Sequence, residues 1–293
     1  MNCGRPAVLF CWALLIVCCA SCSSALRRAE PVPVTAILGA FDKEVDLIES
    51  ELADARGKEI EGIRFVTGKL GGRKVVVVWT GIGKVNAAMT TTLLLEHFKP
   101  SEVVFTGIAG GINPQLQPGD IVIAAKTAQH DSGILWPDSM EYRGVINRLD
   151  GWRNPVFFLA DERLLGAAEK AAGRVKLGTI KTSVGARLPR IVTGVVATGD
   201  IFVASPAKSV ELRESLKADA VEMEGAAVAQ LCYQRQVPHL IIRSISDKAD
   251  EKAREESYFF QEMAAENSAR LIKEIIVVLG VESPVVTPTQ QGT

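Results

Sequence analysis

Short apolar stretches rich in valine and isoleucine alternate along the chain with longer stretches in which apolar residues recur every three or four positions. The first kind is typical of strands buried on both faces, and the second is typical of helices with one buried face. The predicted strands are Val34–Leu38, Lys74–Trp79, Glu102–Phe105, Ile121–Ala125, Ile191–Ala197 and Leu240–Ile245. The predicted helices are Asp42–Leu52, Lys84–Phe98, Arg163–Ala172, Pro206–Leu216, Glu224–Gln234 and Tyr258–Leu279.

This alternation indicates an α/β fold with helices on both sides of a sheet. No internal repeat and no linker rich in Pro and Gly divides the body of the chain. We therefore expect one domain over residues 33–281 and a disordered tail over residues 282–293, which are rich in Pro, Thr and Gln. The least regular segment is Gln129–Pro155, which contains Trp136 and Trp152 and is expected to be a functional or mobile loop.

The first 25 residues have a different pattern. Arg5 precedes an apolar run from Ala7 to Ala20, which is followed by small residues up to Ala25. A short positive region, an apolar core and a small-residue exit predict a signal peptide over residues 1–25 and export to the periplasm. Cleavage after Ala25 and lipid attachment at Cys22 both remain open, and only the second would tie the protein to a membrane.

Composition restricts the chemistry of the remaining chain. The 293 residues are 47% hydrophobic with a formal net charge of −1, so we expect a sizeable core and no nucleic-acid partner. Five of the six cysteines lie within the first 22 residues, which leaves Cys232 as a small core residue. One cysteine and three scattered histidines make neither a disulfide nor a metal site, and we predict no metal and no cofactor.

Candidate chemistry lies where predicted strands end, because ligands of open α/β sheets bind there. Glu44 follows the first strand, where it is equally an ordinary acid of a first helical turn. The glycine-rich segments Thr80–Val85 and Thr106–Gly111 follow two further strands. They expose backbone N–H donors to a ligand, or they are simple tight turns.

Two more strand ends carry acids. Glu222 and Glu224 flank Met223, and carboxylates in such a place can accept hydrogen bonds from sugar hydroxyls. Asp247 follows Ser246 at the end of the last predicted strand. Acids that begin a helix are the ordinary alternative in both places, and for Asp247 this means an N-cap.

Together and in this order, these segments resemble the 5′-methylthioadenosine/S-adenosylhomocysteine nucleosidases of the purine nucleoside phosphorylase superfamily. The similarity runs from Val34 to Leu279 and is densest over Gly81–Ile123. The motifs that carry it are G-I-G-K-V, L-L-L-E-H-x-K-P, T-G-x-A-G-G and G-D-I-V, then T-G-D-I-F, V-E-M-E and S-D-x-A-D.

The resemblance implies a three-layer α/β/α domain around a mixed, partly barrel-like sheet. It also implies a homodimer in which the loop around Ile134–Trp136 lies near the partner's site. The implied reaction is hydrolysis of the N-glycosidic bond of an adenine thioether nucleoside, with a purine nucleoside and water as the small-molecule partners. Phosphorylases of the superfamily carry a phosphate-binding arginine after the first strand, and Gly39–Val45 contains none. A futalosine-type hydrolase and an exported nucleoside-binding protein without turnover are the alternatives.

The resemblance assigns three catalytic residues. Glu44 activates the attacking water, Asp247 protonates N7 of the adenine, and Arg243 helps to hold the network. Around them, aromatic stacking on the base, backbone contacts to its edge, acceptors for the ribose hydroxyls and a lining for the 5′-alkylthio group are implied. The implied substrate-binding residues are Phe41, Ile82, Ile108, Ala109, Gly110, Phe202, Val203, Glu222, Met223, Glu224, Ser246 and Tyr258.

This chemistry makes demands on two pKa values. Asp247 must hold a proton well above the ordinary Asp pKa of about 3.9, whereas Glu44 is expected to stay ionised. The chain also departs from the family pattern in two places. Ile108 stands where many members have Ser or Thr near the water, and the Gln129–Pro155 loop is longer and more aromatic. Both departures leave the specificity for the 5′ group open.

Overall fold

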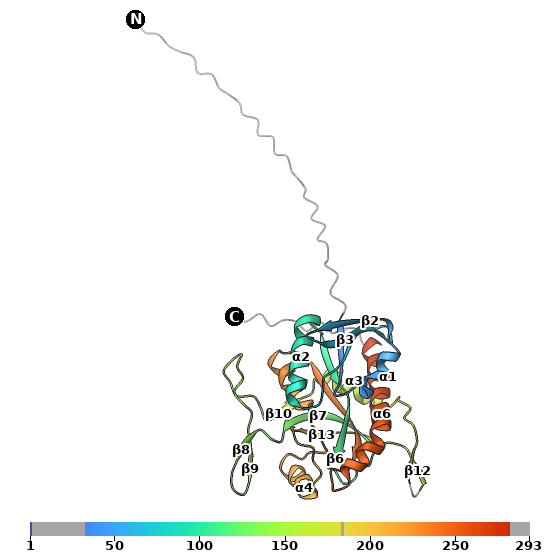
Figure 1. Cartoon of the computed structure of the whole chain (residues 1–293). Helices are drawn as coiled ribbons and strands as arrows, with labels where there is room; N and C mark the ends of the chain where they lie inside the picture. The colour runs from blue at the N-terminus through green and yellow to red at the C-terminus, as the bar shows by residue number, and fades with distance from the viewer. Residues whose placement is uncertain (2–32, 183–184, 282–293) are drawn as a thin grey trace. The chain divides into compact units, whose positions relative to one another are not determined.

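The computed structural model describes residue 1 and residues 33–182 and 185–281 (Figure 1). The predicted signal peptide, Cys22 and the predicted C-terminal tail lie outside the described residues. The fold below is that of the compact unit Val32–Thr293. Within the described residues, no helix combines the length and the apolar run needed to cross a bilayer.

Strands and helices alternate through this unit. The strands are β1 Val34–Gly39, β2 Ala53–Ile60, β3 Ile63–Leu70, β4 Arg73–Trp79, β5 Glu102–Phe105, β6 Ile108–Gly111, β7 Ile121–Gln129, β8 Gly133–Leu135, β9 Met140–Tyr142, β10 Phe157–Leu159, β11 Ile180–Thr182, β12 Gly185–Arg187, β13 Ile191–Thr198, β14 Ala220–Glu222 and β15 His239–Asp247. The helices are α1 Lys43–Ser50, α2 Lys84–Phe98, α3 Glu162–Ala172, α4 Pro206–Ser215, α5 Gly225–Gln234 and α6 Ala253–Val281.

Eleven strands form one mixed sheet in the order β10-β7-β13-β14-β6-β15-β5-β1-β4-β3-β2. An additional antiparallel pairing joins β7 to β15 and closes β7, β13, β14, β6 and β15 into a ring. β10 pairs with β7 on the ring, and beyond β15 the strands β5, β1, β4, β3 and β2 continue as an open sheet in which β15, β5, β1 and β4 run parallel. The predicted mixed, partly barrel-like sheet is confirmed.

Helices cover both faces of the open sheet (Figure 1). The side chains of β1 alternate between two cores: Leu38 packs in the cluster that contains α2 and α5, and Ile37 packs in the cluster that contains α1, α3 and α6. Cys232 of α5 is fully buried in the first of these clusters, as predicted. The predicted three layers follow from strands that are apolar on both faces.

The six predicted strands and six predicted helices are all present, with shifts at their ends. β7 continues to Gln129, four residues past the predicted end, and α6 begins at Ala253 rather than Tyr258. The edge strand β2 and its neighbour β3 were not predicted. Nearly all of β2 is exposed, so its sequence lacks the apolar pattern that reveals a buried strand.

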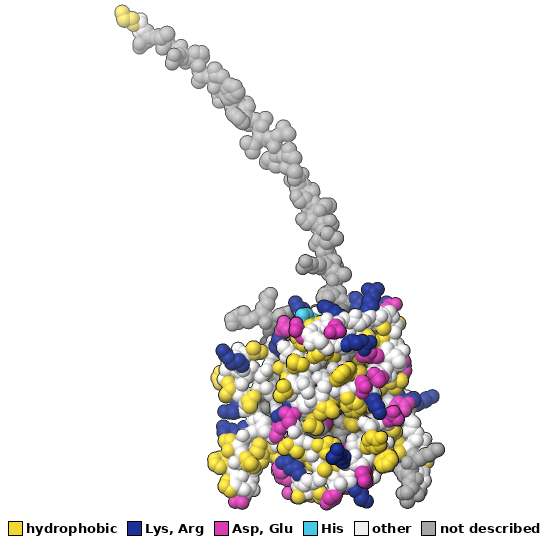
Figure 2. Space-filling model, in the orientation of Figure 1, with side chains coloured by type: hydrophobic (Ala, Val, Ile, Leu, Met, Phe, Trp, Pro, Cys, Tyr) yellow, Lys and Arg dark blue, Asp and Glu magenta, His cyan; other side chains and the backbone are white. Residues whose placement is uncertain are grey.

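The Gln129–Pro155 loop contains more structure than its sequence indicates. β8 and β9 form a hairpin, and a single bridge joins Ile146 to Arg153. Trp136 and Trp152 are both exposed at these two places. The face of the molecule in Figure 2 carries basic and acidic side chains interspersed with apolar ones, in agreement with the near-zero net charge.

The topology explains where the site must form. Because β1, β5 and β15 are parallel neighbours, their carboxyl ends meet at one edge of the sheet. The segments after β1 and β5 and the last residues of β15 are three of the regions in which the sequence places candidate chemistry. The fold thereby brings together side chains that are about 200 positions apart in the chain.

Candidate active site

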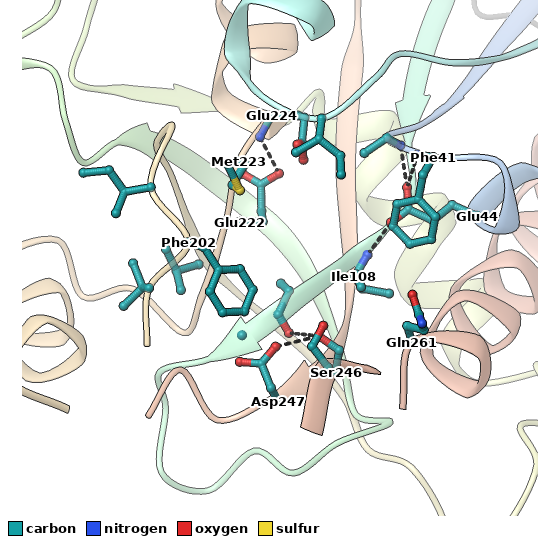
Figure 3. Close-up of a pocket in the computed structure, with 18 residues that line it drawn as sticks. Phe41, Glu44, Ile108, Phe202, Glu222, Met223, Glu224, Ser246, Asp247 and Gln261 are labelled. Atoms are coloured by element: carbon teal, nitrogen blue, oxygen red, sulfur yellow. Dashed lines mark hydrogen bonds between the residues drawn. The ribbon is translucent and has the colours of Figure 1, made fainter. Parts of the chain in front are cut away.

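A cavity of about 270 Å³ lies at this edge of the sheet (Figure 3). Thirteen of the fifteen predicted site residues line it, and Arg243 and Tyr258 do not. The predicted lining residues are Phe41, Glu44, Ile82, Ile108, Ala109, Gly110, Phe202, Val203, Glu222, Met223, Glu224, Ser246 and Asp247. Five further lining residues were not predicted, namely Ala40, Ile201, Val221, Ser257 and Gln261.

Glu44 lies in the first turn of α1, whose N-cap Asp42 accepts a hydrogen bond from Lys43 N–H. Its carboxylate is buried and turns back toward the end of β1, where it accepts hydrogen bonds from the backbone N–H groups of Ala40 and Phe41. Ile108 N–H donates to its other oxygen at 2.9 Å. Three backbone donors therefore fix this carboxylate in the cavity wall.

Glycines make this close packing possible. A Cβ at Gly39 would lie 2.9 Å from the Cβ of Glu44, and a Cβ at Gly107 would lie 2.8 Å from Glu44 Oε1. Neither position can carry a side chain without moving Glu44. The glycines at these strand ends therefore permit a close approach within the protein, in addition to any approach of a ligand.

Burial of Glu44 raises its pKa to about 7, against the lowering effects of Arg243 and the three backbone donors. The ionised form expected from the sequence is therefore the major form of Glu44 only above about pH 7, because desolvation outweighs the charges and donors that stabilise the carboxylate. Glu44 titrates near neutrality, as suits a general base.

Asp247 is the last residue of β15 and is also buried. Ser246 Oγ donates to Asp247 Oδ2 at 2.8 Å, and Ala249 N–H donates to Oδ1 at 2.9 Å. Burial raises the pKa of Asp247, which is the direction that an acid requires, although both hydrogen bonds lower it. Asp247 is not a helix N-cap, because α6 begins six residues later.

Arg243 lies behind the cavity rather than in its lining. Its guanidinium is 1% exposed and donates to Glu222 Oε2 from Nη2 at 2.6 Å and from Nε at 3.1 Å. The guanidinium carbon also lies 4.2 Å from the centre of the Phe105 ring. Arg243 acts on Glu44 through its charge, which lowers the Glu44 pKa, and is therefore a positioning residue.

Glu222 and Glu224 have different environments. Oε2 of Glu222 accepts the Arg243 bonds and two more from the backbone N–H groups of Glu224 and Gly225, and the Thr198 hydroxyl donates to Oε1. Glu224 accepts one hydrogen bond, from Gly83 N–H at 2.8 Å. Burial and the neighbouring Glu222 raise the Glu224 pKa to about 8. Glu224 therefore has free capacity to accept hydrogen bonds from sugar hydroxyls, whereas the Glu222 carboxylate is already occupied by partners within the protein.

The wall that carries Phe202 is held by contacts that the sequence did not reveal. Lys84 N–H donates to Asp200 Oδ1 at 2.7 Å, and Asp200 N–H donates to Asp131 Oδ2 at 3.0 Å. Lys84 Nζ lies 2.6 Å from Asp131 Oδ1. These three residues join the start of α2, the long loop and the Phe202 segment. No motif links them, because each belongs to a different part of the chain.

Tyr258 is not in the pocket. Its side chain is exposed and packs edge-to-face against Phe259, with ring centroids 6.1 Å apart. Ser257 and Gln261, one helical turn apart, line the cavity in its place. The resemblance implied Tyr258 for this wall, but the four-residue spacing in α6 places Ser257 and Gln261 on the face toward the cavity and turns Tyr258 to solvent.

Glu44 and Asp247 lie on different sides of the cavity in Figure 3, with Met223 and Glu224 along a third side. Two carboxyls with raised pKa values thus face a common space from separate walls. This arrangement allows acid and base catalysis on one bound molecule. Among the residues described, no group of three or more His, Cys, Asp and Glu side chains is arranged to hold a metal ion.

Known proteins are similar to this chain in sequence and in fold. Residues 34–277 match the family described as the phosphorylase superfamily. The 5′-methylthioadenosine/S-adenosylhomocysteine nucleosidase of Psychromonas ingrahamii is 40% identical over 242 residues, which cover 82% of this chain and 96% of that protein.

Solved structures agree. The same type of nucleosidase from Colwellia psychrerythraea, in complex with adenine, has a TM-score of 0.72 and 34% identity, with 85% of this chain and 96% of that chain covered. The futalosine hydrolase of Helicobacter pylori has a TM-score of 0.69 and 30% identity, with 84% and 97% covered. The chain therefore belongs to the phosphorylase superfamily and, within it, to the 5′-methylthioadenosine/S-adenosylhomocysteine nucleosidase family of N-glycosyl hydrolases.

Proposed function

We propose that the protein hydrolyses the N-glycosidic bond of 5′-methylthioadenosine, S-adenosylhomocysteine or both, and releases adenine and the thioribose product. The observation that carries this proposal is the pair of buried carboxyls, Glu44 and Asp247, that face one cavity from different walls. The pair has the residue types and the raised pKa values that an acid and a base in one reaction need.

Asp247 donates a proton to the leaving group in the proposed reaction. Adenine leaves poorly as an anion, so a proton given to N7 removes much of the barrier to departure. Burial raises the pKa of Asp247 above its ordinary value, which favours the protonated form that this role needs. Phe202 stacks on the base, and the backbone at Val203 contacts its edge; both residues line the cavity, and Figure 3 shows Phe202 near Asp247.

Glu44 accepts a proton from the attacking water in the proposed reaction. As adenine departs, the ribosyl carbon becomes oxocarbenium-like, and the ionised Glu44 takes a proton from water as the water adds to that carbon. Glu224 accepts hydrogen bonds from the ribose hydroxyls beside Met223. Ile108 offers a backbone N–H to Glu44 but no hydroxyl to the water, so Glu44 itself carries the positioning of the nucleophile.

Water rather than phosphate is the proposed nucleophile. An arginine is absent from the segment after β1, and the N–H groups of Ala40 and Phe41 there donate to Glu44. A phosphate would need those donors and would lie against the Glu44 carboxylate. The negative charges of a phosphate and of the ionised Glu44 carboxylate would repel each other in such close contact, which favours a neutral nucleophile.

The test is to incubate the protein with methylthioadenosine, S-adenosylhomocysteine, futalosine, adenosine and inosine, with and without phosphate, and to measure the free base. We expect adenine release from the thioether nucleosides without phosphate. Release that requires phosphate would contradict hydrolysis. Release from futalosine alone would assign the alternative hydrolase activity, and no release from any nucleoside would favour a binding protein.

We further propose that the protein is a homodimer in which the loop around Ile134–Trp136 lies near the partner's site. Ile82, Val85 and Met89 are each more than half exposed at the start of α2, and Ile82 lines the cavity. Leu135 and Trp136 of the hairpin are also more than half exposed. Apolar surface that continues from a cavity mouth is typical of an interface.

Size-exclusion chromatography with light scattering measures the molar mass of the protein in solution and so tests the oligomeric state. We expect a dimer, and we expect Leu135→Asp to produce monomers with reduced adenine release. A wild-type protein that elutes as an active monomer would contradict the proposal.

We also propose export to the periplasm through residues 1–25. Support comes from the sequence pattern of those residues. Expression of the full chain in a bacterium, followed by fractionation and mass measurement, tests it. A periplasmic chain that begins at Leu26 supports cleavage after Ala25, and a membrane-bound chain that is released by Cys22→Ala supports lipidation. A cytoplasmic chain of full mass would contradict export.

A further inference from the structure

The first turns of α6 present their residues in an unusual way. Ser257 and Gln261, which are polar, line the cavity, whereas Tyr258 and Phe259 are 75% and 76% exposed. A surface helix ordinarily buries its apolar face and exposes its polar face. The spacing of four residues places Ser257 and Gln261 on one face. This part of α6 therefore gives the cavity a polar wall, while two aromatic side chains face solvent.

The Gln261 amide is little used by the protein itself. Within the described part of the chain, its only hydrogen bond is a donation from Nε2 to the Tyr258 carbonyl at 3.4 Å, which is long for such a bond. Figure 3 places Gln261 on the same side of the cavity as Phe41 and Ile108, across from Phe202 and Met223. Phe41 and Ile108 on that side are apolar, Glu44 on the same side is already held by three backbone donors, and the Gln261 amide has capacity for a ligand.

We propose that Gln261, with Ser257 beside it, determines which 5′ substituent the enzyme accepts. This inference rests on the proposed function and on the role that the family resemblance implies for Phe41 and Ile82, which is to line the pocket for the 5′ group of the nucleoside; both line this cavity. An amide at this wall favours a substituent that carries hydrogen-bonding groups. The structure thereby assigns a preference for S-adenosylhomocysteine, whose 5′ substituent ends in an amino acid, over methylthioadenosine, whose 5′ substituent ends in a methyl group.

The physical reason is whether the Gln261 amide has a hydrogen-bond partner when a substrate fills the cavity. A methyl group placed against Gln261 displaces water and leaves the amide without a partner, which is unfavourable. The carboxylate and ammonium of an amino acid can accept from Nε2 and donate to Oε1, and charged partners make the stronger hydrogen bonds. Because Gln261 is only half-buried, we expect a discrimination of about tenfold rather than the larger ratios of enclosed sites.

Gln261→Met tests the proposal, because methionine has nearly the same shape without the amide. We compare kcat/KM for S-adenosylhomocysteine and methylthioadenosine in the full-length wild type and in this variant. The ratio of the two is expected to fall about tenfold, through a higher KM for S-adenosylhomocysteine and a lower KM for methylthioadenosine, whose methyl group no longer leaves an amide without a partner. Glu262→Met is the matched control, because Glu262 is exposed at the next position and does not line the cavity.

An unchanged ratio would overturn the proposal, and so would an equal loss for both substrates, which would place Gln261 in the reaction or in the fold. Gln261→Leu, measured with a thermal unfolding curve, provides a second variant if the first unfolds, and the same ratio decides the result. Failure of the proposed function gives a different result, because the wild type then releases adenine from neither nucleoside.

Discussion

Arg243 and Glu222 form an ion pair from which solvent is excluded. Arg243 Nη2 lies 2.6 Å from Glu222 Oε2, and the two side chains are 1% and 2% exposed. The pair joins the middle of β15 to the end of β14, and the same Glu222 oxygen accepts from the first amides of α5. Both elements carry residues of the site, so the pair holds two walls of the cavity together.

The first prediction is that Glu222→Ala destabilises the protein by about 3–5 kcal/mol, because it leaves the Arg243 guanidinium buried and unpaired. Urea unfolding measures this loss. Glu266→Ala is the control: Glu266 pairs with Arg270 on the surface, and its removal should cost less than about 1 kcal/mol. Equal losses in the two variants would mean that the buried pair has no special role.

The second prediction concerns the pH dependence that Glu44 imposes. Only the ionised carboxylate can take a proton from water, and burial raises its pKa to about 7. The limb of the kcat/KM profile that belongs to Glu44 should therefore rise with pH and end at about pH 7, and a second limb should fall where Asp247 loses its proton. Glu44→Gln should lower kcat by about 10²–10⁴-fold and abolish this rise. Asp46→Asn, an exposed change on the same helix, should leave the profile as it is, and a rise that survives Glu44→Gln would belong to another group.

The third prediction is that Asp247→Asn lowers kcat for adenine release by about 10²–10⁴-fold while the protein stays folded. Asparagine keeps the shape of the side chain but has no carboxyl proton to give to the base. Circular dichroism checks the fold, and a ribosyl substrate whose leaving group departs as a stable anion, such as p-nitrophenolate, checks the role. That substrate should lose much less rate, and near-normal adenine release by the variant would remove Asp247 from the mechanism.

The fourth prediction concerns the contacts behind Phe202. Asp131→Ala removes an acceptor of Lys84 Nζ and the acceptor of Asp200 N–H, and should loosen the segment that carries Phe202, which we propose stacks on the base. We expect KM to rise about tenfold with a smaller change in kcat, because binding is affected more than chemistry. Asp54→Ala is the control, since Asp54 pairs with Lys69 at an exposed edge of the sheet. A fall in kcat alone would contradict this positioning role.

Much of the fold follows from local sequence patterns. β4 contains four consecutive buried valines, and α2 has the bounds that its apolar periodicity predicts. Such elements are predictable because a strand buried on both faces must be apolar throughout. β2 lacks this signal because it lies exposed at the edge, and β6 is hidden in a glycine-rich sequence that indicates turns as readily as a strand.

The site, like the fold, has features that the sequence determines and features that depend on tertiary structure. The sequence alone determined which residue types end the strands, and the resemblance to a known family selected Glu44 and Asp247 among many similar acids. Tertiary structure decided what those acids do. The Glu44 pKa, the pairing of Arg243 with Glu222, and the choice of Gln261 over Tyr258 for the cavity wall all depend on segments far apart in the chain. Burial and the partners of a charge are properties of the packed molecule, because desolvation depends on every neighbour that excludes water.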